Sequence, residues 1–288
     1  MSMNPLRLGL PKGRMQDGVL KLLADAGIDI HMGSRNYRPV VSMKGIEAKL
    51  LKPQNIVEML HAGSREIGFA GADWVAEMGV DLVELLDTEM DPVELVAAAP
   101  EELVPDRKLP SGRHLVVASE YERLTKKWIE DRGIDATFVH SYGATEVFPP
   151  EDADCIVDNT ATGSTLRANG LAIVDVVMTS STRLYTNPKV MEIPEKREVV
   201  DRLVLLLESV LAARRRVMIE VNVDKDHMER VIEALPCMRE PTISPLRGDA
   251  GFAVKAAVPR NELTAIIPEL KARGGTDIVV TELAQIIP

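Results

Sequence analysis

The sequence predicts an α/β protein that ends in a ferredoxin-like domain, and two observations lead to this prediction. Through the first two-thirds of the chain, short apolar runs alternate with amphipathic stretches, which is typical of strands and helices that take turns. The last part of the chain repeats itself, because a shift of 35 residues aligns residues 219–223 with residues 254–258.

The first block of the chain has the pattern strand, loop, helix. Residues 6–10 are apolar, residues 11–14 break the run, and residues 15–26 have apolar side chains at helical spacing before Gly27. The same unit occurs twice more, with strands expected at 48–51 and 67–70 and helices at 55–61 and 73–78.

A second block follows a stretch rich in proline and charge, residues 99–112. It contains further apolar runs that precede turns or helices, and a long amphipathic helix over residues 195–216 ends it. This alternation predicts a parallel or mixed sheet with helices on both faces. The expected strands are 115–118, 136–139, 155–157, 172–178 and 182–185, and the expected helices are 121–132 and 165–169.

The repeat at the C-terminal end predicts two β-α-β units. In each copy, period-two alternation indicates a strand, and a polar residue, Asp226 or Asn261, precedes a helix as its expected N-cap. A second strand closes each copy, around Ile243 and Ile278. Two such units in succession make a ferredoxin-like domain.

The composition excludes several functions. The 288 residues carry 34 Lys and Arg against 44 Asp and Glu, a net charge of −10, with only 3% aromatic residues, so we expect no nucleic-acid binding. No apolar run reaches the ~20 residues that cross a bilayer, and no export signal opens the chain, so we expect a cytoplasmic protein without membrane contact. Neither Cys155 nor Cys237 has a second Cys or a spaced His to complete a set of metal ligands, and the five histidines are dispersed, which predicts no structural zinc.

The segment 154–166 has the sharpest functional signal. An apolar strand delivers Asp158, and a turn of small hydroxyl residues with one glycine then opens a helix. Unpaired N–H groups and the positive end of the helix dipole suit a phosphate there, while Asp158 suits sugar hydroxyls. The alternative is that the hydroxyl residues only cap the helix. The candidate loop residues are Thr160, Thr162, Gly163, Ser164 and Thr165.

Basic residues follow the first expected strand. Lys12 and Arg14 flank Gly13, which allows close backbone approach, so the pair is a candidate for polyphosphate contact at the carboxyl end of the strand. The alternative is that both are solvated loop charges. Asp73 opens a helix, where it is either a site residue or only an N-cap, and Glu146 is a candidate for positioning a substrate or shaping the loop.

Six motifs lie in order along the chain, the loop 154–166 with its extension to Leu171 and five others. The five are Leu-Arg-Leu-Gly-Leu-Pro-Lys-Gly-Arg at 6–14, Lys-Pro-Gln-Asn-Ile at 52–56, Gly-Phe-Ala-Gly-Ala-Asp at 68–73, Tyr-Gly-Ala-Thr-Glu at 142–146 and Leu-Pro-Cys-Met-Arg-Glu-Pro-Thr-Ile-Ser-Pro-Leu at 235–246. The loop resembles the phosphoribosyl diphosphate (PRPP) loop of phosphoribosyltransferases, with Asn159 where a second acid is usual. Together the motifs resemble the ATP phosphoribosyltransferase family in its long form, although Lys52 and Asn55 depart mildly from its Arg-Pro-x-Asp pattern.

The resemblance implies a two-lobed catalytic body similar to periplasmic binding proteins, with the active site in the cleft between the lobes. Lobe I would comprise residues 1–96 and 185–213, and lobe II, with the PRPP loop, residues 97–184. Residues 214–288 would form the ferredoxin-like regulatory domain.

The implied reaction is the first step of histidine biosynthesis. Adenine N1 of ATP attacks the anomeric carbon of PRPP, which gives phosphoribosyl-ATP and diphosphate. The residues implied in this chemistry are Lys12, Arg14 and Asp158. The implied cofactor is Mg²⁺ carried by the substrate phosphates, so no metal ligand of the protein is expected.

The resemblance also implies feedback inhibition by L-histidine at contacts between regulatory domains. Residues 241–244 match the family near that site, which makes Thr242 a candidate, and Asn222 and Asp277 lie at strand positions that can reach it. The alternative is that Thr242 is ordinary strand filler, since threonine favours strands. The implied assembly is a homo-oligomer, either a dimer or a hexamer.

Two other functions stay open at this point. A salvage or orotate-type phosphoribosyltransferase would share the loop, but it would not explain residues 11–14 or the 35-residue repeat. A non-catalytic ligand sensor would fit binding-protein lobes with a regulatory domain. Such a sensor would not need Lys12 and Arg14 in addition to a sugar-phosphate loop.

Overall fold

The structure is a computed structural model that describes residues 4–33 and 37–287. Contacts within the chain divide it into two compact units. The first unit comprises Met1–Lys21 and Ile28–Asp201, and the second comprises Leu22–Gly27 and Arg202–Pro288.

The first unit is built on an eight-stranded mixed sheet with the order β4-β1-β5-β10-β6-β9-β7-β8. One half of it holds the parallel strands β1 (Leu6–Pro11), β4 (Ile46–Leu51) and β5 (Ile67–Gly71). The other half holds the parallel strands β7 (Leu115–Ser119), β8 (Ala136–His140) and β9 (Cys155–Thr160). The expected mixed sheet is therefore confirmed.

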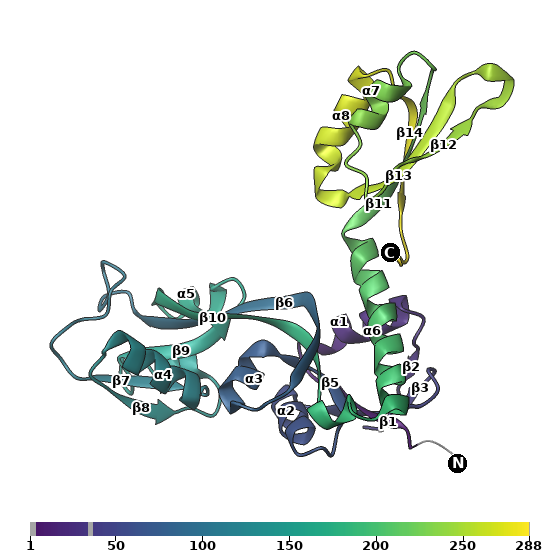
Figure 1. Ribbon diagram of the computed structural model, residues 1–288. Helices are drawn as coiled ribbons and strands as arrows, with labels where there is room; N and C mark the ends of the chain where they lie inside the picture. The colour runs from purple at the N-terminus through teal and green to yellow at the C-terminus, as the bar shows by residue number, and fades with distance from the viewer. Residues whose placement is uncertain (1–3, 34–36, 288) are drawn as a thin grey trace. The chain divides into compact units, whose positions relative to one another are not determined.

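Two long antiparallel strands join the halves. β6 (Val83–Pro100) and β10 (Leu171–Thr186) pair with each other along most of their length, and Figure 1 shows them running side by side through the middle of the sheet. β10 also pairs with β5, and β6 also pairs with β9. The two lobes are thus connected through continuous strands, and the runs expected at 172–178 and 182–185 are parts of one strand.

The sequence did not indicate β6, because acidic residues interrupt its apolar pattern. Glu89 and Asp91 have positive φ angles of 57° and 49°, and the register with β10 shifts around Thr182. Side chains replace part of the backbone ladder there. The hydroxyl of Ser181 donates to Asp87 at 2.7 Å, and that of Thr182 donates to Asp91 at 2.9 Å.

Helices cover both faces of the second half of this sheet. Alternate residues of β6 face opposite sides. Leu95 and Ala97 pack in the cluster that contains Trp128 of α4 (Glu122–Arg132), whereas Val96 packs in the cluster that contains Leu166 of α5 (Ser164–Ala168). β7 and the first part of β9 are therefore buried on two sides, which explains their nearly continuous apolar runs, whereas the edge strand β8 has no buried residue.

The remaining helices follow the strands as expected, within one or two residues. α2 (Pro53–His61) packs so closely on the first half that a Cβ on Gly68 would lie 2.6 Å from Ile56 Cγ2, so only glycine fits there. The others are α1 (Gln16–Asp25), α3 (Ala72–Met78) and α6 (Pro194–Arg214). A small pair, β2 (Ile30–His31) and β3 (Val40–Val41), was not anticipated.

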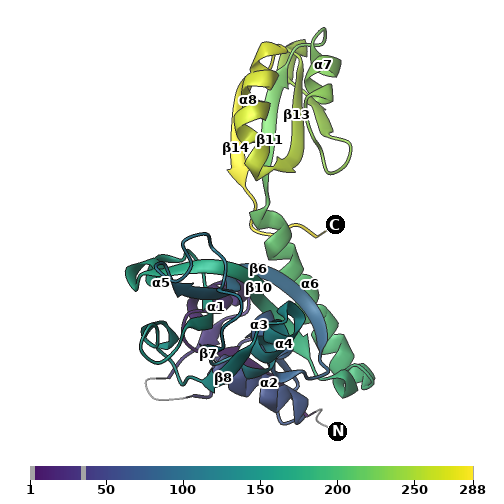
Figure 2. The same cartoon turned by 90° about the vertical axis from the view of Figure 1, so that its left-hand side faces the viewer.

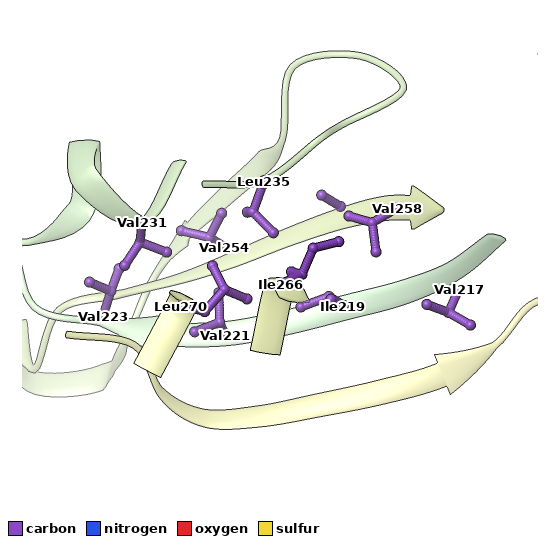
Figure 3. Packing of buried hydrophobic residues seen from close by; sticks show 11 residues of the cluster. Val217, Ile219, Val221, Val223, Val231, Leu235, Val254, Val258, Ile266 and Leu270 are labelled. Atoms are coloured by element: carbon purple, nitrogen blue, oxygen red, sulfur yellow. The ribbon is translucent and has the colours of Figure 1, made fainter. Parts of the chain in front are cut away.

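The second unit contains the ferredoxin-like domain that the repeat predicts. Its strands pair in the order β12-β13-β11-β14, all antiparallel, and α7 and α8 cover one face of the sheet (Figure 2). Valine and isoleucine side chains of β11 and β13 meet Ile266 and Leu270 of α8 in its core (Figure 3). The elements are β11 (Arg216–Val223), α7 (Met228–Glu233), β12 (Thr242–Pro245), β13 (Phe252–Pro259), α8 (Leu263–Ala272) and β14 (Thr276–Glu282).

The two N-caps expected in this domain are wrong. α7 has His227 at its N-cap position without a side-chain cap, and the carboxylate of Asp224 instead accepts the backbone N–H of His227 at 3.0 Å. Asn261 lies inside a 3₁₀ turn, Arg260–Glu262, that precedes α8. In both copies a turn precedes the helix. The N-cap position therefore falls one residue later than predicted, at His227 and Glu262.

A buried ion cluster ties the first half together. The side chain of Glu66 is only 6% exposed, accepts the backbone N–H of Arg7 at 3.0 Å and pairs with the side chains of Arg7 and Lys196. Burial favours the protonated carboxyl, but the hydrogen bonds from Arg7 and Lys196 outweigh it and lower the pKa of Glu66. The cluster therefore connects β1, the start of β5 and the start of α6.

We expect Glu66→Gln to reduce the free energy of unfolding by about 3 kcal/mol at pH 7, because it leaves two cations around a neutral amide. The folded-state pKa of Glu66 lies below the ordinary value, so its stabilisation is present above about pH 4.3 and is lost as the pH falls. Urea unfolding of both proteins at pH 7 and near pH 3.5 measures the difference, which should shrink at the lower pH.

Glu47→Gln is the matched control, because Glu47 is half exposed and lies 3.7 Å from Arg65 in a surface pair. Its effect should stay below about 1 kcal/mol. Equal losses for the two variants would contradict the role given to the buried cluster.

Candidate active site

A cavity of about 300 Å³ opens in the first unit at the carboxyl ends of β1 and β5. In sheets with parallel strands, ligands bind at these ends. The irregular segment of β6 and β10 forms another wall, since Asp91 and Thr182 line the cavity. Its walls also include Lys12, Arg14, Asp73, Trp74, Asn159 and Ser180.

The structure brings three of the candidate residues to this cavity, Lys12, Arg14 and Asp73. The other candidates do not line it, although Asn159, the neighbour of Asp158, does. The candidates that lie beside the cavity or farther from it are Gly13, Glu146, Asp158, Thr160, Thr162, Gly163, Ser164 and Thr165.

The two cations stand on the turn that follows β1. Gly13 has a φ of 81°, a conformation that favours glycine, and this turn points the chain from the strand into α1. Lys12 is partly buried, with its Nζ 3.4 Å from the centroid of the Tyr37 ring, while Arg14 is exposed. The ring holds one cation in place at the cavity wall.

Asp73 is buried and fully engaged. Its Oδ1 accepts the hydroxyl of Ser180 at 2.8 Å, and its Oδ2 accepts the hydroxyl of Tyr121 at 2.7 Å. The N-cap of α3 is Gly71, so the alternative that Asp73 is only an N-cap is wrong. A Cβ on Gly71 would lie 2.1 Å from Asp73 Oδ1, so the glycine makes room for this carboxylate.

Tyr121 links Asp73 to the loop. Its ring is fully buried and stacks on Trp74, with centroids 4.6 Å apart, and its oxygen accepts the side-chain amide of Asn159 at 2.9 Å. Burial first and the Asp73 carboxylate second raise the pKa of Tyr121, so the phenol keeps its proton. Sequence reasoning missed Tyr121 and Trp74, because each sits next to a helix start and looks like an ordinary core aromatic.

Asp158 lies partly buried near the end of β9. Burial, the charge of Glu146 and the charge of Glu120 raise its pKa to about 6, against a smaller opposing effect of the N–H of Asn159. Asp158 Oδ1 accepts that N–H at 2.7 Å. Glu146, whose charge contributes to this raised pKa, lies on the 3₁₀ turn Thr145–Val147.

The loop after β9 is held by its own side chains. The hydroxyl of Thr160 accepts the N–H of Gly163 at 2.9 Å, and the hydroxyl of Thr162 donates to Ser164 at 3.1 Å. Gly163 is the N-cap of α5 with a φ of 69°, so no side chain caps the helix from that position. Ser164 and Thr165 begin α5 and are exposed.

Arg167 is a further residue of this loop that sequence reasoning passed over. A Cβ on Gly163 would lie 2.9 Å from Arg167 Nη1, which places the guanidinium beside the loop backbone. Arg167 lies in the sequence motif that continues from the loop to Leu171. Only the structure shows that its guanidinium lies next to Gly163.

Among residues 4–33 and 37–287, no group of three or more His, Cys, Asp or Glu side chains is placed to hold a metal ion. Both oxygens of Asp73 are already hydrogen-bonded within the protein.

The inhibitor candidates lie on the sheet of the ferredoxin-like domain. The side-chain amide of Asn222 donates to Asp277 Oδ2 at 3.1 Å, and Asp277 has a φ of 46° where the register between β11 and β14 shifts. Thr242 pairs with Lys255, and Lys255 pairs with Glu220. The structure therefore joins Asn222 to Asp277 but keeps Thr242 two strands away on the same face.

The fold and the site define a class. The first unit has two α/β halves joined by two strands, with a cation-lined cavity and a hydroxyl-rich loop after a strand. A ferredoxin-like domain follows it in the chain. This combination is typical of a phosphoribosyltransferase with a regulatory domain. In the part of the chain that the structure describes, no helix combines the length and apolarity needed to span a membrane.

Comparison with known proteins identifies the family. The family model described as ATP phosphoribosyltransferase matches residues 52–209, and the model of the HisG C-terminal domain matches residues 213–285. The ATP phosphoribosyltransferase of Chlorobaculum parvum is 38% identical, over 99% of each chain, and that of Chlorobium luteolum is 37% identical, over 98% of this chain and 97% of its own. The chain belongs to the ATP phosphoribosyltransferase family, and its function is the first step of histidine biosynthesis.

A solved structure supports the same assignment. The ATP phosphoribosyl transferase (HisG:HisZ) complex from Thermotoga maritima superposes with a TM-score of 0.61 at 26% identity, over 70% of this chain and 98% of its own. The predicted fold class and family are thus confirmed. The salvage-type enzyme and the ligand sensor have no support from these relatives.

We expect Asp158→Asn, a change at a candidate site residue, to stabilise the fold. The folded-state pKa of Asp158 is raised, so its ionisation destabilises the fold fully above about pH 6 and not at all below about pH 4. The substitution should therefore raise the free energy of unfolding by on the order of 2 kcal/mol at pH 8 and by little at pH 4. Denaturant unfolding at the two pH values measures this.

Asp152→Asn serves as the control, because Asp152 is exposed on the turn before β9. It should change stability by less than about 0.5 kcal/mol at either pH. A stabilisation by Asp158→Asn that is the same at both pH values would contradict the electrostatic origin.

Proposed function

We propose that the cavity at the ends of β1 and β5, with the neighbouring loop, is the active site in which adenine N1 of ATP attacks the anomeric carbon of PRPP. The observation that carries this proposal is the chain of hydrogen bonds from Asp73 through Tyr121 to Asn159, which sets the loop beside the cation-lined cavity. Particular residues of the chain are thereby assigned to the reaction of the family.

In this proposal the loop binds PRPP. Residues 162–165 hold the 5′-phosphate with exposed hydroxyls and with backbone N–H groups other than that of Gly163, which Thr160 accepts. Arg167 adds a cation beside Gly163. Asp158 accepts the ribose hydroxyls, and Glu146 keeps its carboxylate basic through its own negative charge. An ionised Asp158 is needed for this contact, so PRPP should bind more weakly as the pH falls through about 6.

Lys12 and Arg14 contact the diphosphate and the triphosphate. The anomeric carbon gains positive character as diphosphate leaves, so the enzyme needs to align the reactants and to stabilise the departing charge. No general base is required, because adenine N1 attacks through a lone pair that carries no proton. The residues of the site therefore contribute to catalysis by orienting the two substrates and by placing positive charge next to the departing diphosphate.

Mg²⁺ fits this site as an ion carried by the substrate phosphates. Such an ion takes its oxygen ligands mainly from phosphates and water, with few protein carboxylates. When bound, it neutralises charge on the diphosphate. Lys12 and Arg14 would hold the same phosphates from the protein side.

The domain limits and the assembly belong to the same proposal. Lobe I spans 1–96 and 185–213, lobe II spans 97–184 and the regulatory domain spans 214–288. The Thermotoga maritima relative is a complex, which supports an oligomer, and we propose a homo-oligomer that is a dimer or a hexamer. The biosynthetic role of the family supports a cytoplasmic location.

We also propose that L-histidine inhibits the enzyme at the ferredoxin-like domain. The bonded pair of Asn222 and Asp277 offers a carboxylate and an amide to an amino acid. Thr242 lies on the same face, two strands away from Asn222, and we place the inhibitor site at a contact between two such domains.

The experiment for the active site measures formation of phosphoribosyl-ATP from ATP and PRPP. Asp158→Ala should lower kcat/KM for PRPP by about 100-fold, because it removes the acceptor of the ribose hydroxyls. Lys12→Ala should lower it by at least 10-fold, because it removes a cation from the phosphates. Glu240→Ala, an exposed change in the regulatory domain, should leave the rate unchanged.

The experiment for regulation measures inhibition of the same reaction by added L-histidine. Thr242→Ala and Asn222→Ala should each raise the half-inhibiting concentration by at least 5-fold with kcat within twofold, since they lie in the other unit. Inhibition that stays unchanged in both variants would remove the regulatory role given to this face.

A further inference from the structure

We propose that Asn159 is a positioning residue of the active site, required as a neutral N–H donor that holds the loop-bearing strand β9 to α3 through Tyr121 and Asp73. This inference rests on the proposed binding of PRPP at the loop. It gives a role to the one position at which the loop departs from the usual pair of acids.

The hydrogen bonds form one continuous chain across the two halves of the sheet. The amide of Asn159, on β9, donates to Tyr121 Oη at 2.9 Å, and Tyr121 Oη donates to Asp73 Oδ2 at 2.7 Å. The second oxygen of Asp73 accepts the hydroxyl of Ser180, on β10, at 2.8 Å. Asn159 lines the cavity itself, so the chain ends where substrate would lie.

The proton count fixes the chemistry of residue 159. The hydroxyl of a phenol has one hydrogen to donate, and a carboxylate only accepts hydrogen bonds. Tyr121 therefore donates its hydroxyl hydrogen to Asp73. Its oxygen then offers only lone pairs to residue 159. A donor fits there, and the amide of asparagine supplies one without charge.

An aspartate at 159 would fail in two ways. Its carboxylate would face the phenol oxygen with no hydrogen between them. It would also add a negative charge beside Asp73 and Asp158, and the carboxyl of Asp158 is already held protonated to a higher pH by burial and by Glu146 and Glu120. The second acid that is usual in salvage-type loops is therefore incompatible with this tyrosine.

The other end of the chain is firmly anchored, so Asn159 is the link that sets the loop. Glu77 near the end of α3 accepts the N–H groups of Arg123 and Leu124 at 2.9 and 3.0 Å, and these are the free donors at the start of α4. In return the guanidinium of Arg123 donates to Ala76 O at the end of α3. This reciprocal capping fixes Tyr121, which precedes α4, against Asp73.

The test measures KM for PRPP, KM for ATP and kcat of the full-length enzyme in four variants. Asn159→Leu keeps the size of the side chain but removes the donor, and it should raise KM for PRPP by about 3- to 10-fold with kcat within twofold. Asn159→Asp should raise it by more than 10-fold. Adding Asn159→Leu to Tyr121→Phe should raise KM no further, because the acceptor is already gone.

Asn261→Leu is the matched control, since Asn261 is exposed in the other unit, and all three parameters should stay unchanged. The inference is overturned if Asn159→Asp behaves as the wild type, or if the effects of Asn159→Leu and Tyr121→Phe multiply. Since Asn159 is itself exposed, the comparison of its leucine and aspartate variants is decisive even if Tyr121→Phe folds poorly.

Asp158→Ala separates this inference from the proposed function. If Asp158→Ala leaves KM for PRPP unchanged, PRPP does not bind at the loop and both proposals are overturned. If Asp158→Ala raises KM for PRPP and Asn159→Leu does not, only the positioning role of Asn159 is overturned.

Discussion

The buried carboxylate of Asp73 is the constraint on which the site depends. A buried carboxylate needs donors for its oxygens, and Asp73 takes them from Ser180 on β10 and from Tyr121 at the start of α4. Satisfying one charge therefore joins α3, β10 and the start of α4. Gly71 is required because any larger residue would occupy the place of that carboxylate.

The chain and its polyanionic substrates both carry negative charge. A net charge of −10 repels polyanions at long range, so binding depends on where individual cations stand. Lys12 and Arg14 reach the cavity from the turn after β1, and Arg167 lies at the loop. Burial raises the pKa of Asp158 to about 6, so its ionisation destabilises the fold, and the proposed contact with the ribose hydroxyls would explain why the residue is kept there.

The strands β6 and β10 serve both the fold and the site. They carry polar side chains into the sheet where its two halves meet, and bonds such as that of Thr182 to Asp91 replace part of the backbone ladder. The same irregular segment brings Ser180 to Asp73 and puts Asp91 on the cavity wall. The irregular segment of β6 and β10 therefore weakens the strand pattern in the sequence, and it is also where side chains of the two halves form hydrogen bonds with each other.

The sequence by itself determined the mixed sheet, the ferredoxin-like domain and the family, because period-two and helical spacing, the 35-residue repeat and the ordered motifs are local signals. It also selected Lys12, Arg14 and Asp73, which meet at one cavity. Only the tertiary structure decided the course of β6, the partners of Asp73 and the place of Tyr121. Hydrogen bonds such as Tyr121 to Asp73 span 48 residues of chain, and no local pattern records a partner that folding alone brings near.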